Sequence, residues 1–193
     1  MNITDLHNLH TGQTVCIVGK GPSLKHLSSK HFNEDHVIIW LNDSVRVATA
    51  MWLKNKTYSL QKDGDPRYMV RPDDNMVLLV QGASAGSRYS SGWFRDHPNR
   101  IILDPVTELG FQHVETTATV MAIAIAKLMG CSHIRMMCCD ILTTEDARTI
   151  HTVSMEPELD TYKQAIYAYA KSDVLKDLQS ISHDFVIPNG EKL

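Results

Sequence analysis

The chain has 193 residues, of which 43% are hydrophobic and 21% charged, and its formal net charge is -3 at pH 7. This length predicts a single domain with a core of its own, spanning residues 1–193. The slight negative charge argues against a nucleic-acid polymer or a lipid surface as partner, because both select a basic face. The N-terminus has no apolar signal segment and no apolar run is long enough to span a membrane, so we expect a cytoplasmic protein.

Short apolar segments that alternate with helical patterns predict the secondary structure. In chain order, strands are expected at residues 15–18, 37–41, 58–61, 76–80, 100–104, 134–139 and 184–188. Helices are expected directly after the first strand's glycine turn and at residues 45–53, 118–129 and 157–180. Such alternation is typical of an open parallel sheet wound with helices. The predicted fold class is therefore α/β, a Rossmann-like three-layer fold with a mostly parallel central sheet.

The four cysteines are Cys16, Cys131, Cys138 and Cys139. They lack the paired spacing of a zinc site. We expect reduced thiols that pack as small core residues, which is usual in a cytosolic protein.

A glycine-rich turn, Gly19-Lys20-Gly21-Pro22-Ser23, follows the first predicted strand. Its glycines leave room for a ligand, Pro22 suits the first turn of a helix, and Ser23 or Gly21 suits the cap. A helix that begins here would present N–H groups to an anion, most often a phosphate, and Lys20 can neutralise the phosphate charge. The alternative is a plain strand-to-helix turn, because both the P-loop and the third glycine of a dinucleotide fingerprint are missing.

Other polar candidates also follow predicted strands, and parallel sheets bind ligands beyond the carboxyl ends of their strands. Asn42 offers an amide that can bond a ribose or a base, or it caps the next helix. Asp63 and Asp65 are two residues apart. They are suited to a Mg²⁺ ion that bridges phosphates, or they lie in a solvated turn.

Asp140 and His151 are the catalytic candidates. Asp140 ends a very apolar strand, where a carboxylate is costly to bury unless it is paired or bound; alternatively, it caps the next segment. His151 lies in the loop that follows and can serve as a general base near neutral pH. The alternative for His151 is an ordinary surface histidine, since the chain has 10 histidines.

Two blocks of the sequence resemble known families. The first is residues 15–24, which end in Gly-Lys-Gly-Pro-Ser-Leu, and the second is residues 116–140, a helix followed by a strand that ends in Asp140. They are similar to corresponding blocks of the bacterial lipooligosaccharide sialyltransferases, which use CMP-sialic acid. They also resemble a related family that includes archaeal hydroxymethylpterin diphosphokinases and motility accessory proteins. Here Lys20 replaces the usual Asn or Ala, and Cys139 replaces the glycine before the aspartate.

The resemblance implies roles for the candidate residues. The glycine turn, through Gly19, Gly21, Pro22 and Ser23, would line the nucleotide phosphates. Asn42 matches the asparagine that ends the second strand of the sialyltransferases. Thr117 would lie near the cytidine or the sugar, and His151 would be the base that deprotonates the acceptor hydroxyl.

Three hypotheses follow. The first is a sialyltransferase-like glycosyltransferase that depends on a nucleotide-sugar. The second is a diphosphokinase-like enzyme with Mg²⁺ on Asp63, Asp65 or Asp140. The third is a non-catalytic nucleotide- or sugar-binding protein. In each case the partner is a nucleotide or a nucleotide-sugar, Mg²⁺ is the one candidate cofactor, and a homo-oligomeric state is left open.

Overall fold

The computed structural model describes residues 2–61, 71–81, 96–110, 117–139 and 182–186. Within these ranges one seven-stranded sheet forms the centre of the chain. Every pair of neighbouring strands is parallel. The strands are β1 (Thr14–Val18), β2 (Val37–Leu41), β3 (Thr57–Gln61), β4 (Val77–Gln81), β5 (Arg100–Leu103), β6 (His133–Met137) and β7 (Ser182–Val186). The predicted α/β fold with a parallel sheet is confirmed.

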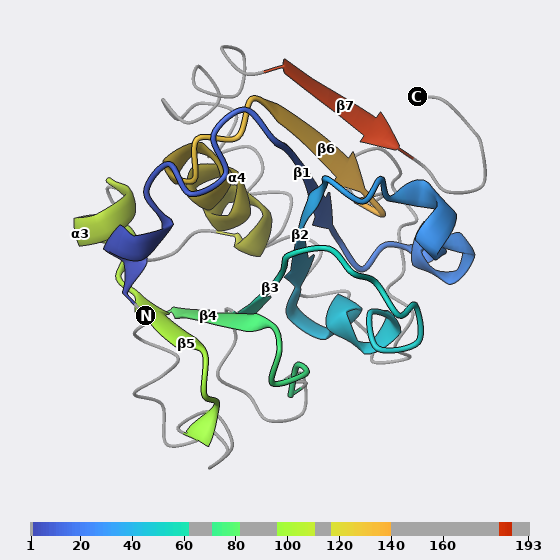
Figure 1. The fold of residues 1–193 in the computed structure, drawn as a ribbon, viewed down its shortest axis with the longest axis horizontal. Coiled ribbons are helices and arrows are strands. Elements are labelled where there is room, and N and C mark those ends of the chain that lie inside the picture. Colours follow the sequence, from blue (N-terminus) through green and yellow to red (C-terminus); the bar gives the residue numbers. More distant parts are fainter. Residues whose placement is uncertain (1, 62–70, 82–95, 111–116, 140–181, 187–193) are drawn as a thin grey trace, which may run out of the picture.

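The strand order is β5-β4-β3-β2-β1-β6-β7. The chain adds each strand from β1 to β5 on one side, then returns past β1 to place β6 and β7 on the other side (Figure 1). The direction of winding therefore reverses between β1 and β6. In open parallel sheets, ligands bind beyond the carboxyl ends of the strands at such a reversal point.

Each face of the sheet has its own apolar core, because side chains along a strand alternate between the two faces. Val15 and Ile17 of β1 belong to a core that is covered by the helix α4 (Ala118–Leu128). Cys16 and Val18 belong to the opposite core, which is covered by short 3₁₀ helices. These are η2 (Pro22–His26) and η4 (Asn42–Val47), whereas η3 (Ser29–His31), which lies between them in the chain, has no buried residue. Figure 1 shows α4 on the left of the sheet and the short blue and cyan helices on the right, which gives three layers.

The helix predictions are confirmed for α4 and corrected elsewhere. Thr117 caps α4, since its Oγ1 accepts a hydrogen bond from the Val120 N–H at 3.2 Å. The expected helices after the glycine turn and at 45–53 are the 3₁₀ helices η2, of five residues, and η4, which ends at Val47. The chain leaves η2 at Leu27, whose backbone is extended, so an α-helix does not propagate there. The segment 157–180 lies outside the described residues.

Two further helices were not expected from the pattern. They are the 3₁₀ helix η1 (Ile3–Leu6), which packs on the α4 core, and the α-helix α3 (Pro105–Leu109). The four cysteines are buried, as predicted for thiols that pack as small core residues. Among the described helices, all fall short of the length and apolarity that a bilayer crossing requires.

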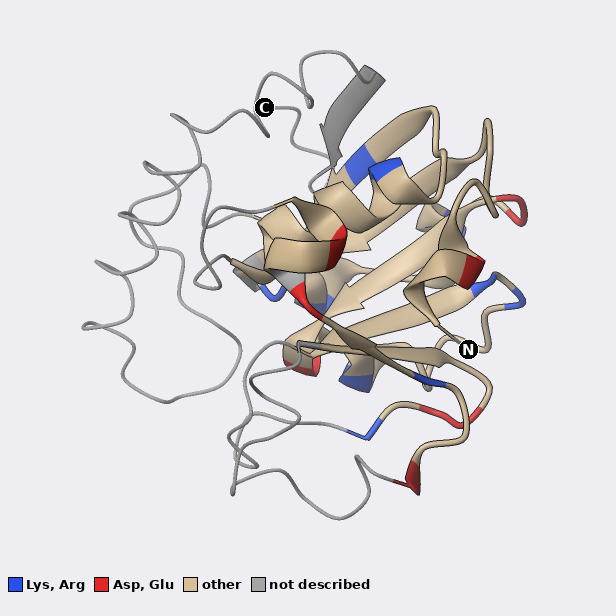
Figure 2. Ribbon diagram, turned by 90° about the vertical axis from the view of Figure 1, so that its left-hand side faces the viewer, with Lys and Arg blue, Asp and Glu red and all other residues tan. Residues whose placement is uncertain are grey.

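Charged residues are nearly absent from the sheet. The strands β1 to β4 contain no Lys, Arg, Asp or Glu. In Figure 2 most of the blue and red segments lie on helices and turns around the tan strands. Continuous apolar strands of this kind are expected where both faces of a parallel sheet are covered.

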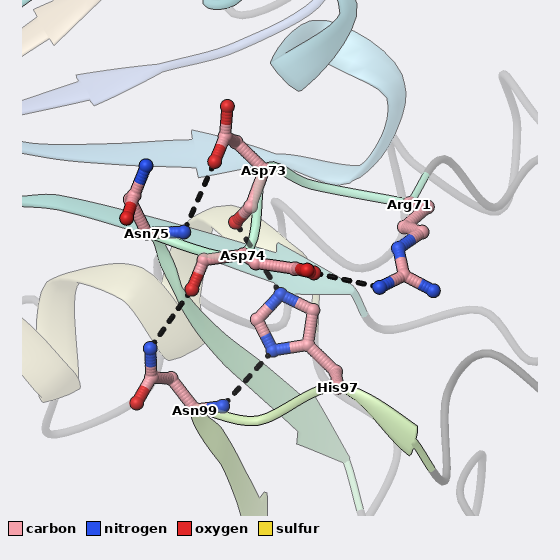
Figure 3. A network of polar contacts seen from close by, with 6 residues as sticks. All are labelled: Arg71, Asp73, Asp74, Asn75, His97 and Asn99. Atoms are coloured by element: carbon pink, nitrogen blue, oxygen red, sulfur yellow. Dashed lines mark hydrogen bonds and ion pairs between the residues drawn. The ribbon is translucent and has the colours of Figure 1, made fainter.

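At the amino ends of the strands, His97 joins two turns (Figure 3). The turn before β4 carries Asp73 and Asp74, and the turn before β5 carries His97 and Asn99. The Asn99 N–H donates to His97 Nδ1 at 3.3 Å, so the ring proton is on Nε2, which donates to the Asp73 carbonyl oxygen at 3.4 Å. Asn99 Nδ2 also donates to the Asp74 carbonyl oxygen at 2.9 Å. Both turns are therefore held by a neutral imidazole.

A second neutral histidine lies at the same edge of the sheet. His10 Nδ1 donates to Gln13 Oε1 at 2.7 Å, and His10 Nε2 accepts from the Tyr58 hydroxyl at 2.7 Å. Gln13 Nε2 donates to the Asp35 carbonyl oxygen at 3.4 Å, which fixes the orientation of the Gln13 amide. Burial lowers the pKa of His10 and of His97 below the ordinary value of 6.5.

We expect the chain to lose stability as the pH falls from 7 to 5. The folded state keeps His10 and His97 neutral, whereas the unfolded chain protonates them around the ordinary pKa of 6.5. The unfolded state then binds more protons, so the free energy of unfolding falls, by at most about 1.4 kcal/mol per pH unit for each histidine. Urea denaturation across this pH range measures the slope.

Two variants isolate the contribution of His97. In His97→Gln the slope should be smaller than in the unaltered chain, because one group no longer titrates. In Leu9→Gln, at an exposed position without a titratable side chain, the slope should stay the same. An unchanged slope in His97→Gln would contradict a buried, neutral His97.

Candidate active site

The glycine turn after β1 is bonded to the end of β6. The Gly19 N–H donates to the Met137 carbonyl oxygen at 2.8 Å, and the Gly21 N–H donates to the Cys138 carbonyl oxygen at 2.8 Å. The turn therefore bridges the two strands at which the order of the sheet reverses. This is the position at which the sequence predicted a ligand.

Gly19 is required there by packing. A Cβ atom at this position would lie 2.6 Å from the Cys138 carbonyl oxygen and 2.9 Å from Cys139 Sγ. Only a residue without a side chain allows the two backbones to approach so closely. Cys138 has a φ of 54°, a conformation that is uncommon outside glycine and marks the sharp bend at which β6 ends.

The turn differs from the expected anion site in one respect. The N–H groups of Gly19 and Gly21 donate to β6, Pro22 has no N–H group, and η2 is a single short helix. A phosphate therefore does not take these two glycine amides as donors while they are bonded to β6. The turn instead fixes the position of the side chains around it, of which Lys20 carries the charge.

Lys20 lies opposite a carboxylate. Its Nζ is 3.7 Å from Asp43 Oδ1, and the exposed fractions of the two side chains are 20% and 6%. Asp43 is the second residue after β2 and directly follows Asn42. Ser44, the next residue, donates its hydroxyl to the Val18 carbonyl oxygen at 3.0 Å, which ties this segment to the end of β1.

Asn42 is held in an uncommon backbone conformation. Its φ is 50°, which asparagine tolerates better than most residues. The Asn42 carbonyl oxygen accepts from Gln61 Nε2 at 2.9 Å, and the same Nε2 donates to Ser59 Oγ at 2.8 Å. The segment that follows β2 is thus bonded to the end of β3, and this bond fixes the positions of Asn42 and Asp43.

Buried polar side chains gather at this carboxyl edge of β1, β2 and β3. They are Ser23, Asn42, Asp43, Ser44, Ser59 and Gln61. Polar groups are costly to bury unless they are bonded, so their concentration beside a reversal point marks a candidate ligand site. Sequence reasoning placed Asp43 and Gln61 among the polar residues that follow strand ends, but it gave no specific role to Asp43, Ser59 or Gln61. The signal available in the sequence was that Ser59 and Gln61 alternate with Tyr58 and Leu60 in a strand that is buried on both faces.

Thr117 lies toward the same edge of the sheet. The other end of α4 is at the amino edge, because the Met129 and Gly130 carbonyl oxygens accept from the His10 and Gly12 N–H groups just before β1. The helix runs from Thr117 to that end, so Thr117 is at the carboxyl side. It is buried and its hydroxyl caps the helix.

The remaining predicted site residues are Asp63, Asp65, Asp140 and His151, all of which lie outside the described residues. Their assignment to Mg²⁺ and to catalysis stays a prediction. In the part of the chain that the structure describes, no three His, Cys, Asp or Glu side chains are grouped so that they could hold a metal ion. The structure thus brings together the glycine turn, Asn42 and Asp43 at one edge, with Thr117 on the side of α4 toward it.

A parallel sheet with a glycine turn at its reversal point defines the Rossmann-like class of α/β domains. No family model and no curated protein sequence matches the chain. Solved sialyltransferase structures share its fold. The sialyltransferase CST-II with a trisaccharide acceptor and CMP is 14% identical, with 92% of this chain and 82% of that chain covered at a TM-score of 0.53.

Two structures of Campylobacter jejuni proteins give similar values. CstII with cytidine-5'-monophosphate is 15% identical, with coverage of 93% and 82% and a TM-score of 0.54. The monofunctional alpha-2,3-sialyltransferase Cst-I is 13% identical, with coverage of 94% and 78% and a TM-score of 0.55. These likenesses show a common fold. The resemblance to archaeal diphosphokinases stays a prediction.

We expect Gly19→Ala to lower the free energy of unfolding by about 1–3 kcal/mol, as overpacking does elsewhere. The Cys138 carbonyl is backbone and cannot swing away from the new methyl group. Adding Cys139→Ala removes the sulfur contact and should recover part of the loss. Urea denaturation of the single and double variants measures both effects.

Gly12→Ala is the matched control. Gly12 has a φ of 78°, and no atom lies within 4 Å of the place that a Cβ atom would take, so a methyl group there meets strain and no clash. The loss in free energy of unfolding that Gly12→Ala causes should stay the same when Cys139→Ala is added. Full stability of Gly19→Ala would contradict the close approach of β1 and β6.

Proposed function

We propose that the chain is a nucleotide-sugar-dependent glycosyltransferase of the sialyltransferase type, with its donor at the carboxyl edge of β1, β2 and β6. The observation that carries this proposal is the coincidence of three features at one place. The sheet order reverses there, a glycine turn packs there, and buried polar side chains gather there. Structures of the same fold are described as complexes with CMP and with a trisaccharide acceptor, which supports the choice of ligand.

The charges of the edge suit a nucleoside monophosphate. Lys20 supplies a cation beside the glycine turn, and Asn42 supplies an amide at the end of β2. The Lys20 ammonium neutralises the donor phosphate in the ground state and the leaving phosphate as its charge develops. Thr117 lies toward the same edge, near the cytidine or the sugar.

The reaction is a displacement at the sugar carbon. The acceptor hydroxyl oxygen forms a bond to that carbon as the bond to the phosphate oxygen breaks, and CMP leaves with the electron pair. His151 takes the proton from the acceptor hydroxyl, and Asp140, which follows β6 in the sequence, is the second catalytic candidate. Lys20 and Asn42 set the position of the donor.

CMP should raise the melting temperature of the chain, equally in EDTA and in Mg²⁺. A ligand at about 100 times its Kd adds roughly 2.7 kcal/mol to the free energy of unfolding. The measurement is a thermal-shift series with CMP, CDP, UDP, GDP, ATP and GTP. A rise confined to ATP or GTP with Mg²⁺ would favour the diphosphokinase-like alternative. No rise with any nucleotide would contradict a nucleotide site.

His151→Ala should reduce sugar transfer from CMP-sialic acid to an oligosaccharide acceptor by about 10²–10⁴-fold, the usual contribution of a general base. The CMP-induced thermal shift should remain, because the base does not hold the nucleotide. His7→Ala, at an exposed position at the amino end of the fold, is the control and should keep full transfer. Unchanged transfer in His151→Ala would refute the assignment of the base. Intact CMP binding without any transfer would favour the non-catalytic alternative.

A further inference from the structure

Asp43 is a nearly buried carboxylate at the edge of the sheet where the donor is proposed to bind. Its side chain is 6% exposed, and Asp43 is the second residue after β2, directly following Asn42. The segment is fixed on both sides, by Ser44 to the end of β1 and by the Asn42 carbonyl to β3. The carboxylate therefore has a defined place beside the glycine turn.

The position of Asp43 along the chain has a known physical meaning. In dinucleotide-binding Rossmann domains, a carboxylate about 20 residues beyond the glycine turn accepts a hydrogen bond from the ribose 2′-hydroxyl. Ionised carboxylates only accept hydrogen bonds, and ribose hydroxyls are donors. A phosphate oxygen would be repelled by the same group. Asp43 thus suits the ribose part of a nucleotide and Lys20 suits its phosphate.

The distance between Asp43 and Lys20 is consistent with one residue binding the ribose and the other the phosphate. The Nζ to Oδ1 distance of 3.7 Å is longer than the roughly 2.7–2.9 Å of a direct charge-assisted hydrogen bond. The two opposite charges attract each other across this distance without being locked together. The Lys20 side chain is 20% exposed, so part of it remains accessible to a ligand phosphate.

We propose that Asp43 accepts hydrogen bonds from the ribose hydroxyls of the bound nucleotide and makes the site selective for ribonucleotides over 2′-deoxyribonucleotides. This inference rests on the proposed function, since it names a determinant of the same site. A hydrogen bond to a charged acceptor that is lost inside a nearly buried site weakens binding by about 10- to 100-fold.

The experiment is calorimetric titration of the full chain with CMP and with 2′-deoxy-CMP. The unaltered chain should bind 2′-deoxy-CMP about 10- to 100-fold more weakly than CMP. In Asp43→Ala the two affinities should become nearly equal. Asp35→Ala is the matched control: it removes an exposed carboxylate just before β2, at the opposite edge of the sheet, and it should keep the difference.

The outcomes separate this inference from the proposed function. Equal affinities for CMP and 2′-deoxy-CMP in the unaltered chain, or an unchanged difference in Asp43→Ala, would overturn the role of Asp43 and leave the nucleotide site standing. No binding of either nucleotide would overturn both. Where Asp43→Ala fails to fold, Asp43→Asn keeps the shape of the side chain and removes its charge. The difference should then narrow, and an unchanged difference would again overturn the inference.

Discussion

The contact between the glycine turn and the end of β6 is the constraint on which the candidate site depends. Two backbone hydrogen bonds, from Gly19 and Gly21, join the turn to the last carbonyls of β6, and the missing side chain of Gly19 leaves room for Cys138. Because β6 is far from β1 in the sequence, this contact joins two distant segments at the point where the strand order reverses. It also fixes the turn from which Lys20 reaches Asp43.

The two edges of the sheet have different chemistry. At the amino edge, neutral rings with matched donors and acceptors hold the chain, as in the pairing of His10 with Tyr58 and of His97 with the turn at Asp73. At the carboxyl edge, the Asp43 carboxylate is buried with several amides and hydroxyls, and the partly exposed Lys20 lies opposite it. Such a partly buried charged pair is weak evidence for stability, because desolvation offsets much of its attraction. Its place beside the reversal point makes a ligand the better explanation.

The fold follows from the sequence because each step is local. Continuous apolar runs predict strands that are covered on both faces, and every predicted strand is found with bounds that differ by at most two residues. The strong helix begins at residue 118, as predicted, and Thr117 caps it. The helices around Pro22 and Val45 were misjudged, since their apolar spacing fits both an α-helix and a short 3₁₀ turn. Packing on a neighbouring strand, which decides between the two, is not a local property.

By itself, the sequence determined the class of fold, the order of elements and the set of residues that follow strand ends, because hydrophobic period and turn chemistry are written in neighbouring positions. Only the tertiary structure decided which strand ends meet. It placed β6 beside β1, bonded the Gly19 and Gly21 amides to that strand, and set Lys20 opposite Asp43. These are contacts between distant segments, and their distances follow from the strand order of the folded sheet, which no short stretch of sequence encodes.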